Sequence, residues 1–358
     1  MNVLYVSPTC GPHDLRFLQA LSDRKVDAHF LCLTPDEEGR DISVPVTRIG
    51  WTSDGVDVEQ LRQIAEKIRP AVVHAGPVPG PAWLVARAGL RPLVSASWGS
   101  DLLREVQHNV QSHERARFAV EHTDVALADC AAVNSAFREL GMAPERIVTF
   151  PWGVDLQDFS LTAAPSISGP LTLFSGRRWE PLYGTAELVE AFALATQGGA
   201  ALRLRLLGSG SEHDRVGELT ARPHMRGKVQ RMAEVPESEI GRQLGKSDVY
   251  VSASHCDGSS VTLLQAMASG LPVIASDIPG NREWVSHDHN GWLFPPGDVS
   301  ELARLMVHAS ASRSQLRPMG LRSRSIAEER ADWSRHVDSL LGAYRLAMTA
   351  SGEATYPH

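Results

Sequence analysis

The sequence predicts an α/β protein of two doubly wound, Rossmann-like domains, and three observations carry this prediction. First, 358 residues are more than one ordinary hydrophobic core organises, and a composition with 43% hydrophobic and 22% charged residues is that of a globular protein. Second, short apolar runs alternate with segments of helical periodicity. Third, the alternation starts again after residues 160–170, which are rich in Ser, Pro and Gly.

Four apolar runs in the first half are strand-like: Val3–Val6, Ala28–Leu33, Val72–His74 and Leu93–Ala96. Each is too continuous for a half-exposed strand, so we expect a parallel sheet that is buried on both faces. Between them, Leu15–Ser22 and Val58–Ile68 carry apolar residues at i, i+3 and i+4, which indicates helices. Alternating strands and helices of this kind are typical of a doubly wound domain.

The second half repeats the pattern, with strands expected at Leu171–Ser175, Leu202–Leu207, Val249–Ser252 and Pro272–Ala275. Helices are expected at Tyr183–Thr196 and at the amphipathic Trp333–Ala350. We therefore place the domains at 1–160 and 171–332. Residues 333–358 are expected to form a helix that packs back toward the first domain, followed by a loose tail. Because ligands of open α/β sheets bind beyond the carboxyl ends of the strands, two facing sheets would place a cleft between the domains.

Charge and cysteine usage narrow the class of protein. The net charge of −7 gives no support to a nucleic-acid groove or a polybasic membrane face. The four cysteines have no CxxC spacing, which favours reduced thiols over a zinc site or disulfides. With no signal peptide and no transmembrane run, we expect a cytoplasmic protein. Weak peripheral membrane contact and either a monomer or a homodimer stay open.

The most informative stretch is Val249–Asp298. A strand is followed by Asp257, then by the small-residue turn Gly258-Ser259-Ser260, and then by a helix that begins at Val261. Backbone N–H groups and the helix dipole make such a helix start a ready anion site. Gln265 follows Asp257 by eight residues, so both side chains can border a ligand at that position.

These residues resemble the donor domain of retaining GT-B glycosyltransferases of the family 4 type. The family signature is an acidic residue, seven residues and a glutamate, then "EAMA.G.PV" and "NG.L.PPGD"; this chain has Asp257-x7-Gln265, Ala266–Ala275 and Asn290–Asp298. Further resemblances lie in both halves, in the family's order: Trp98–Asp101, Glu145–Asp155, Ser175–Arg178 with Gly184, and Leu207–Gly210.

The resemblance implies a nucleotide-diphospho-sugar donor and an acceptor hydroxyl or amine, on a small molecule, a natural product or a glycan intermediate. It implies no cofactor and no obligatory metal. Asp257 and Arg178 become the candidate catalytic residues. The candidate donor-binding set is Gly11, Arg177, Arg178, Tyr183, Gly208, Gly210, Asp257, Gly258, Ser259, Ser260, Val261, Thr262 and Gln265.

Candidate acceptor-binding residues follow strands of the first domain: His13, Asp14, His74, Trp98 and Asp101. Each has a structural alternative. Asp14 and Asp101 are placed to cap helices, and His74 ends a buried strand, where a core histidine is as expected as a ligand contact. Gly11 would allow the backbone to approach a donor phosphate or an acceptor closely.

Three positions depart from the family pattern. Gln265 stands where a glutamate is expected to bind the ribose hydroxyls, Tyr183 where a lysine meets the diphosphate, and Trp98 where a histidine lies near the donor sugar. An amide oxygen still accepts a hydrogen bond, without charge assistance. We therefore expect Gln265→Glu to leave turnover intact or to raise donor affinity. Two alternatives stay open: a nucleotide-sugar epimerase or hydrolase, and a non-catalytic sugar-nucleotide-binding protein.

Overall fold

The computed structural model describes residues 1–34, 42–50, 58–163, 168–350 and 352. Its internal contacts divide the chain into two compact units. Unit 1 comprises Met1–Trp152 together with Ser334–His358, and unit 2 comprises Gly153–Trp333. Of the tail expected to be loose, all but Gly352 lies outside the described residues.

Unit 2 begins earlier than residue 171, where the sequence analysis places the second domain. Val154 pairs with the end of the last helix of unit 2: its N–H donates to Ala331 O at 2.8 Å, and its carbonyl accepts from Trp333 N at 3.0 Å. Farther along, Thr162 N donates to Ser269 O at 2.9 Å. The described part of the expected linker is therefore fastened to unit 2 by backbone hydrogen bonds.

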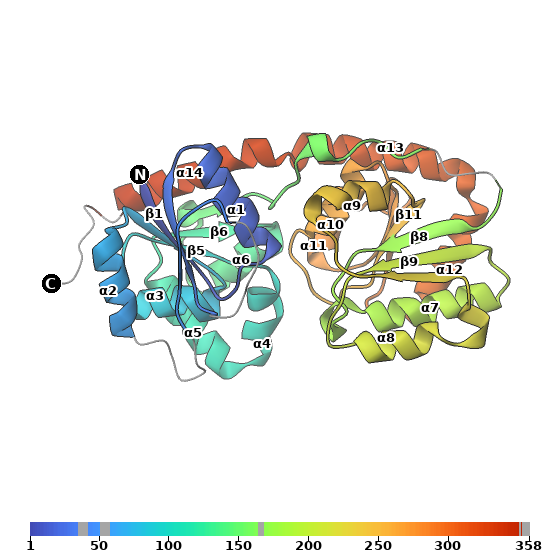
Figure 1. Ribbon diagram of the computed structural model, residues 1–358, viewed down its shortest axis with the longest axis horizontal. Coiled ribbons are helices and arrows are strands. Elements are labelled where there is room, and N and C mark those ends of the chain that lie inside the picture. Colours follow the sequence, from blue (N-terminus) through green and yellow to red (C-terminus); the bar gives the residue numbers. More distant parts are fainter. Residues whose placement is uncertain (35–41, 51–57, 164–167, 351, 353–358) are drawn as a thin grey trace. The chain divides into compact units, whose positions relative to one another are not determined.

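Unit 1 contains a seven-stranded parallel sheet with the strand order β3-β2-β1-β4-β5-β6-β7 (Figure 1). Its strands are β1 (Asn2–Ser7), β2 (Asp27–Cys32), β3 (Val46–Arg48), β4 (Val72–Ala75), β5 (Leu93–Ala96), β6 (Val125–Ala128) and β7 (Ile147–Thr149). Its helices are α1 (Pro12–Asp23), α2 (Val58–Ile68), α3 (Trp83–Arg87), α4 (Val106–His108), α5 (Val110–Glu121), α6 (Ala131–Glu139) and, from Ser334 on, α14 (Trp333–Ala350).

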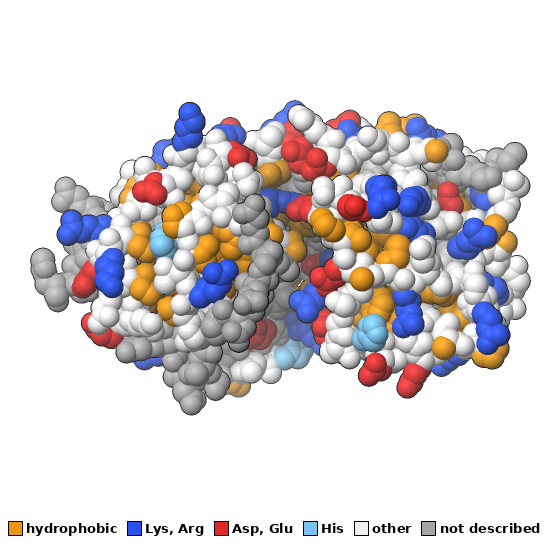
Figure 2. All heavy atoms as spheres, viewed as in Figure 1, with side chains coloured by type: hydrophobic (Ala, Val, Ile, Leu, Met, Phe, Trp, Pro, Cys, Tyr) orange, Lys and Arg blue, Asp and Glu red, His pale blue; other side chains and the backbone are white. Residues whose placement is uncertain are grey.

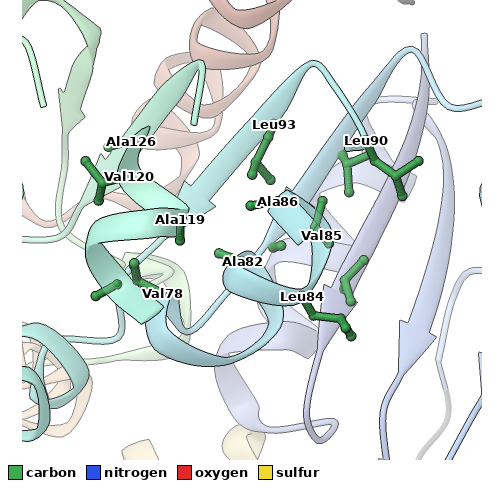
Figure 3. Close-up of a cluster of buried hydrophobic side chains, with 14 of the residues drawn as sticks. Val78, Ala82, Leu84, Val85, Ala86, Leu90, Leu93, Ala119, Val120 and Ala126 are labelled. Carbon is green, nitrogen blue, oxygen red and sulfur yellow. The ribbon is translucent and has the colours of Figure 1, made fainter. Parts of the chain in front are cut away.

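The alternation of side chains along β1 assigns the helices to the two faces of this sheet. Leu4 and Val6 join an apolar cluster with residues of α2, α3 and α5. Figure 3 shows part of this cluster, where α3 and α5 pack over β5 and β6. Tyr5 points to the other face and contacts Phe17 of α1, at a ring-centroid distance of 6.2 Å. The sheet is thus buried on both sides, as its continuous apolar runs predict.

Unit 2 contains a six-stranded parallel sheet with the order β10-β9-β8-β11-β12-β13. Its strands are β8 (Leu171–Ser175), β9 (Leu202–Leu207), β10 (Val229–Met232), β11 (Val249–Ser252), β12 (Val273–Ser276) and β13 (Gly291–Phe294). Its helices are α7 (Thr185–Gln197), α8 (His213–Thr220), α9 (Glu237–Leu244), α10 (Val261–Ala268), α11 (Pro279–Arg282), α12 (Val299–Ala311) and α13 (Arg313–Arg330).

Two apolar clusters cover the two faces of the second sheet. One contains residues of α7, α8 and α12, and the other contains residues of α9, α10 and α13 (Figure 1). The contact between α10 and α13 is close, because a Cβ on Gly320 would lie 2.0 Å from Gly270 O. The predicted α/β class with two parallel sheets is confirmed.

Four arginines of α13 bind backbone carbonyls of other segments of unit 2. Arg324 Nη1 donates to Phe159 O at 2.6 Å, and Arg317 Nη1 donates to Thr162 O at 2.7 Å. Arg322 and Arg330 bind His289 O and Glu283 O in the same way. Figure 2 shows Lys and Arg side chains interspersed with Asp and Glu on the face in view. Among the described residues, no helix is long and apolar enough to cross a membrane.

Candidate active site

Unit 2 brings two loops together where its strand order reverses. β8 and β11 are neighbours, and the sheet continues through β9 on one side and through β12 on the other. Because the carboxyl ends of parallel strands lie at one edge of the sheet, the loops that follow β8 and β11 meet there. The first loop contains Gly176 and Arg177, and the second contains Asp257 and leads into α10.

Arg177 connects these two loops. Its Nη2 donates to Asp257 Oδ2 at 2.6 Å, while its Nη1 donates to Ser260 Oγ at 2.7 Å and lies 3.3 Å from Thr262 Oγ1. Tyr250 of β11 lies beneath, with its hydroxyl 2.9 Å from Thr262 Oγ1. Among the described residues, the buried Nε of Arg177 has no hydrogen-bond partner. One guanidinium therefore links the end of β8 to the first turn of α10.

Arg177 and Asp257 form a buried ion pair, with side chains 10% and 15% exposed. Burial by itself lowers the pKa of Arg177, but the facing Asp257 carboxylate raises it above its usual value. A buried ion pair is tolerated only where hydrogen bonds satisfy its remaining polar atoms, and Ser260 and Thr262 supply such contacts here. The site thus holds a fixed cation with a carboxylate beside it.

The start of α10 adds partial positive charge beside Arg177. Ser260 is the N-cap residue, and its side chain makes no capping hydrogen bond to the helix amides. It accepts from Arg177 instead. The first backbone N–H groups of a helix have no partner within the helix and carry the positive end of its dipole. The guanidinium and the helix start together form an anion-binding arrangement.

Helix α11 and the residue pair that follows it hold this arrangement in place. Trp284 Nε1 donates to Ser259 Oγ at 3.3 Å. Gly280 of α11 packs so closely on the turn that a Cβ would lie 2.6 Å from Asp257 O and 2.3 Å from Gly258 O. The position of the Asp257–Ser260 turn therefore depends on backbone packing as well as on Arg177.

Tyr183 covers the guanidinium of Arg177, with Arg177 Cζ 4.2 Å from the ring centroid. The next residue, Gly184, has a left-handed φ of 61°, and a Cβ there would lie 2.4 Å from Ala253 O. Only glycine fits both conditions without strain. The Tyr183 ring thus packs on the Arg177 guanidinium, at the position where the family pattern has a lysine.

The structure places Arg177, and not Arg178, in the site. The Arg178 side chain is 69% exposed, and its Nη2 lies 3.6 Å from Glu180 Oε1. Glu180 Oε1 also accepts from Ser211 N at 3.1 Å. The assignment of Arg178 as a catalytic residue is therefore redirected to Arg177, because the backbone after β8 turns the earlier of the two adjacent side chains toward α10.

Gly208 and Gly210 support the loop that follows β8. Their φ values are +138° and +159°, and a Cβ at either position would lie within 2.6 Å of a backbone carbonyl, Arg177 O for Gly208 and Trp179 O for Gly210. Trp179 N also donates to Ser209 O at 2.8 Å. Because they lack a Cβ, both glycines allow the backbone of the Arg177–Trp179 segment to approach closely.

Gln265 lies on α10, with 3% of its surface exposed. Its Nε2 donates to Glu237 Oε1 of α9 at 3.3 Å, whereas its buried Oε1 has no hydrogen-bond partner among the described residues. A buried acceptor without a donor is unusual in a native structure. Gln265 therefore carries a buried acceptor that no described residue satisfies.

Among the predicted acceptor-binding residues of unit 1, Asp14 is engaged by its own fold. Asp14 Oδ2 accepts from Gly11 N at 2.7 Å, and its Oδ1 accepts from Tyr5 Oη at 3.1 Å. Burial raises the pKa of Asp14 to about 6. Gly11 is the N-cap residue of α1, with an ordinary φ of −81°. Asp14 thus closes the first turn of α1 as its third residue, whereas the structural alternative has it as the cap of a helix that starts at Leu15.

His74 lies in the core of unit 1. It is 1% exposed, and its Nδ1 lies 2.7 Å from Tyr344 Oη of α14. Its ring also lies 4.6 Å from the ring of Tyr5. Burial lowers the pKa of His74 to about 3, so the ring is neutral at ordinary pH. These contacts make His74 a core histidine.

Asp101 organises the loop after β5. Its Oδ1 accepts from Ser97 Oγ at 2.7 Å and from Trp98 N at 2.9 Å, and its Oδ2 accepts from Val78 N at 3.0 Å. These bonds fix Trp98, whose ring centroid lies 6.1 Å from that of the half-buried His13. Of the five predicted residues, His13 and Trp98 are thus the pair with side chains near the surface at the carboxyl edge of this sheet.

Sequence reasoning missed several residues of the site. Glu237 comes from a segment whose local pattern carries no signal of a ligand, and Gly280 and Trp284 lie in the Val249–Asp298 stretch but are not among the candidate site residues. His255 lies two residues before Asp257, and its Nε2 is 3.0 Å from Glu187 Oε1 of α7. In the described part of the chain, no group of three or more His, Cys, Asp or Glu side chains is arranged to hold a metal ion.

Two family models match the chain, and together they cover most of it. The model described as "Glycosyl transferases group 1" matches residues 169–311, and the model described as "Glycosyl transferase 4-like" matches residues 2–129. The first of these spans the candidate site of unit 2.

Solved structures confirm the fold. The chain superposes with a TM-score of 0.80 on an Anabaena protein in complex with UDP and glucose, at 20% identity, covering 96% of this chain and 99% of that one. It superposes with a TM-score of 0.82 on sucrose-phosphate synthase of Thermosynechococcus elongatus, at 16% identity, covering 98% and 100%. The fold is therefore that of the GT-B glycosyltransferases.

Relatives with assigned names agree with this class. An amylovoran biosynthesis glycosyltransferase of Erwinia amylovora is 26% identical over 55% of this chain and 50% of its own length. A D-inositol 3-phosphate glycosyltransferase of Pseudarthrobacter chlorophenolicus is 28% identical over 82% of this chain and 74% of its own length. The chain spans about half the length of the first relatives it matches. The chain thus carries a region that matches the group 1 glycosyl transferases and a region that matches the glycosyl transferase 4-like model.

Proposed function

We propose that the chain is a retaining glycosyltransferase that moves a sugar from a nucleotide-diphospho-sugar to an acceptor hydroxyl or amine. The observation that carries this proposal is the position of Arg177 beside the start of α10, at the strand reversal of unit 2. Transfer requires stabilisation of the diphosphate as it leaves, which is an electrostatic task. A guanidinium supplies charge in a planar fork that matches phosphate oxygens, and the helix amides add oriented dipoles.

In the proposed reaction, the bond between donor C1 and the phosphate oxygen breaks through an oxocarbenium-like state. The acceptor oxygen or nitrogen forms the new bond to C1 on the same face, and its proton passes to the leaving diphosphate. This course follows from the family resemblance. Asp257 is proposed to orient hydroxyls of the donor sugar, and Gln265 Oε1 to accept from a ribose hydroxyl. Arg177 replaces Arg178 as the proposed diphosphate residue.

A UDP-sugar is the first donor to test, because solved structures with this fold contain UDP with glucose or UDP-glucose. The proposed acceptor is a small molecule, a natural product or a glycan intermediate, with His13 and Trp98 as its candidate contacts. We also propose that no metal is obligatory, since Arg177 and the helix start supply positive charge. Four buried cysteines, which form no disulfide with one another, suit a reducing cytoplasm.

Product analysis distinguishes transfer from the two alternatives. The purified chain is incubated with UDP-, GDP-, ADP- and TDP-sugars, with and without acceptors, in the presence and absence of EDTA. Acceptor-dependent nucleotide release with a product of unchanged anomeric configuration supports the proposal. Acceptor-independent conversion indicates an epimerase or hydrolase, and saturable binding without conversion indicates a binding protein. An inverted product, or activity abolished by EDTA, would contradict the retaining or the metal-independent part respectively.

A further inference from the structure

The contact between Gln265 and Glu237 assigns a role to a residue outside the family signature. We propose that Glu237 is a positioning residue, which fixes the amide of Gln265 so that its carbonyl oxygen faces the ligand. The inference rests on the proposed function, because the ligand group that Gln265 would meet is a hydroxyl of the donor's ribose.

The geometry defines which amide atom is held and which is left for a ligand. Gln265 is on α10, and Glu237 is the first residue of the neighbouring helix α9. Gln265 Nε2 donates to Glu237 Oε1 at 3.3 Å, and Gln265 Oε1 is buried without a partner among the described residues. Rotating the amide by half a turn would exchange these two atoms.

Glu237 excludes that rotation through the chemistry of its side chain. An ionised carboxylate only accepts hydrogen bonds, whereas an amide has one accepting end and one donating end. The amide must therefore direct its NH₂ group toward Glu237, since the opposite orientation would place two acceptor oxygens against each other. Glu237 is exposed and retains contact with solvent, whereas Gln265 is buried. The group that would contact the ligand, the Gln265 amide, is thus neutral. The negative charge that the family signature has on the glutamate of α10 belongs here to Glu237 of α9.

This arrangement reverses the expectation for the Gln265→Glu variant. The new carboxylate would lie about as far from Glu237 as the amide does now, and like charges in a buried place disfavour each other strongly. We therefore expect Gln265→Glu to weaken nucleotide binding. The double variant Glu237→Gln/Gln265→Glu restores one carboxylate and one amide in exchanged positions, and it should recover binding.

Selectivity for ribose over deoxyribose measures the proposed role directly. Calorimetry with the full chain would give the dissociation constants of UDP, GDP and ADP and of their 2′-deoxy and 3′-deoxy forms. Loss of a hydrogen bond that leaves a buried acceptor unsatisfied corresponds to a preference of about tenfold for the ribonucleotide. Gln265→Ala should reduce this preference to about twofold, and Glu237→Ala to about threefold, since a freely rotating amide presents either end.

Matched controls separate positioning from a general effect on the fold. Glu239→Ala removes an acidic side chain two residues farther along α9, where it forms an ion pair with Arg242, and it should keep the wild-type preference. Glu237→Ala and Glu239→Ala should melt close to the wild-type temperature, because neither removes a buried side chain. A Glu237→Ala variant with full ribose preference, or a double variant no better than Gln265→Glu, would overturn the inference while leaving the proposed function intact. If no nucleoside diphosphate binds the wild-type chain, the proposed function fails as well.

Discussion

The hydroxyl of Tyr344 lies 2.7 Å from Nδ1 of His74, which joins two residues 270 positions apart in the sequence. The contact fastens the C-terminal helix α14 to the central strand β4 of unit 1. Tyr344 is fully buried, and its ring meets that of His74 edge to face at a centroid distance of 5.8 Å. The last helix is therefore part of the core of the first unit.

Removing the Tyr344 hydroxyl should destabilise unit 1 without affecting the candidate site in unit 2. Tyr344→Phe keeps the ring but leaves His74 Nδ1 without this partner, at a cost of about 1–2 kcal/mol in the free energy of unfolding. Urea unfolding, with amide hydrogen exchange in β4 as the readout, would measure this loss in the free energy of unfolding. Tyr344→Ala should cost about 3–5 kcal/mol, since it also leaves a cavity. Equal stability of the Phe variant and the wild type would show that the hydrogen bond contributes nothing.

The stability of unit 1 should contain two opposing pH dependences. Burial raises the pKa of Asp14 to about 6 from 3.8, so the folded state binds a proton more tightly than the unfolded state. Stability from Asp14 is therefore lost as pH rises from about 4 to 6, by about 3 kcal/mol. Burial lowers the pKa of His74 to about 3 from 6.5, so stability from His74 is lost as pH falls from 6.5 toward 3.

Single variants should separate the contributions of Asp14 and His74 to stability, which oppose each other between about pH 4 and 6. In Asp14→Asn the Asp14 contribution is absent, and the unfolding free energy should rise more steeply with pH than in the wild type. In His74→Asn the His74 contribution is absent, and the slope should change in the opposite direction. Calorimetric melting at half-unit pH steps tests both. Parallel pH profiles for the wild type and Asp14→Asn would rule out the raised pKa of Asp14.

Two adjacent arginines should differ sharply in their effect on catalysis. Arg177→Ala removes the buried cation and should lower kcat/KM by about a hundredfold, as the loss of a preorganised electrostatic contact does. Arg178→Ala changes an exposed side chain and should stay within about threefold of the wild type. Because Arg177→Ala leaves Asp257 buried without its cation, Arg177→Ala/Asp257→Asn serves to check that the fold survives. A large loss in Arg178→Ala with a small one in Arg177→Ala would reverse the assignment.

Gly280→Ala should displace the Asp257–Ser260 turn, because the added Cβ would lie 2.3 Å from Gly258 O. The neighbour is backbone, which cannot move aside as a side chain can. We expect a loss of about 1–3 kcal/mol in stability and weaker nucleotide binding. Gly342→Ala on α14 is the matched control, since nothing lies within 4 Å of its Cβ, and it should be neutral or slightly stabilising. Comparable melting temperatures and dissociation constants for the two variants would disprove the steric argument.

The parallel sheets were predictable because strands buried on both faces are continuous apolar runs, as in Val72–His74 and Leu93–Ala96. Which of the two arginines, Arg177 or Arg178, contacts α10 was not predictable. Adjacent side chains leave a loop in different directions, and the path of the backbone between Gly176 and Gly184 decides which one faces α10. No spacing rule describes that path.

Long-range contacts account for the other differences. Glu237 meets Gln265 across 28 residues, and its own surroundings in the sequence resemble any solvent-exposed helix start. The boundary between the units follows the pairing of Val154 with residues 331–333, which local composition does not encode. The Ser/Pro/Gly content of residues 160–170 predicts irregular backbone, which the structure shows at residues 160–163 and 168–170, but it does not reveal that Arg317 binds Thr162 O and Arg313 binds Gly169 O.

The discontinuity of unit 1 has a consequence for biosynthesis. Residues 1–152 leave the ribosome long before Ser334–His358, with the whole of unit 2 between them. At ordinary rates of translation, that interval is roughly 10 to 40 s. During this time the aromatic face formed by Tyr5, Phe17 and His74 lacks the ring of Tyr344. A nascent chain arrested before α14 therefore exposes an apolar surface that chaperones bind, and unit 2 is the first part of the molecule that can complete its fold.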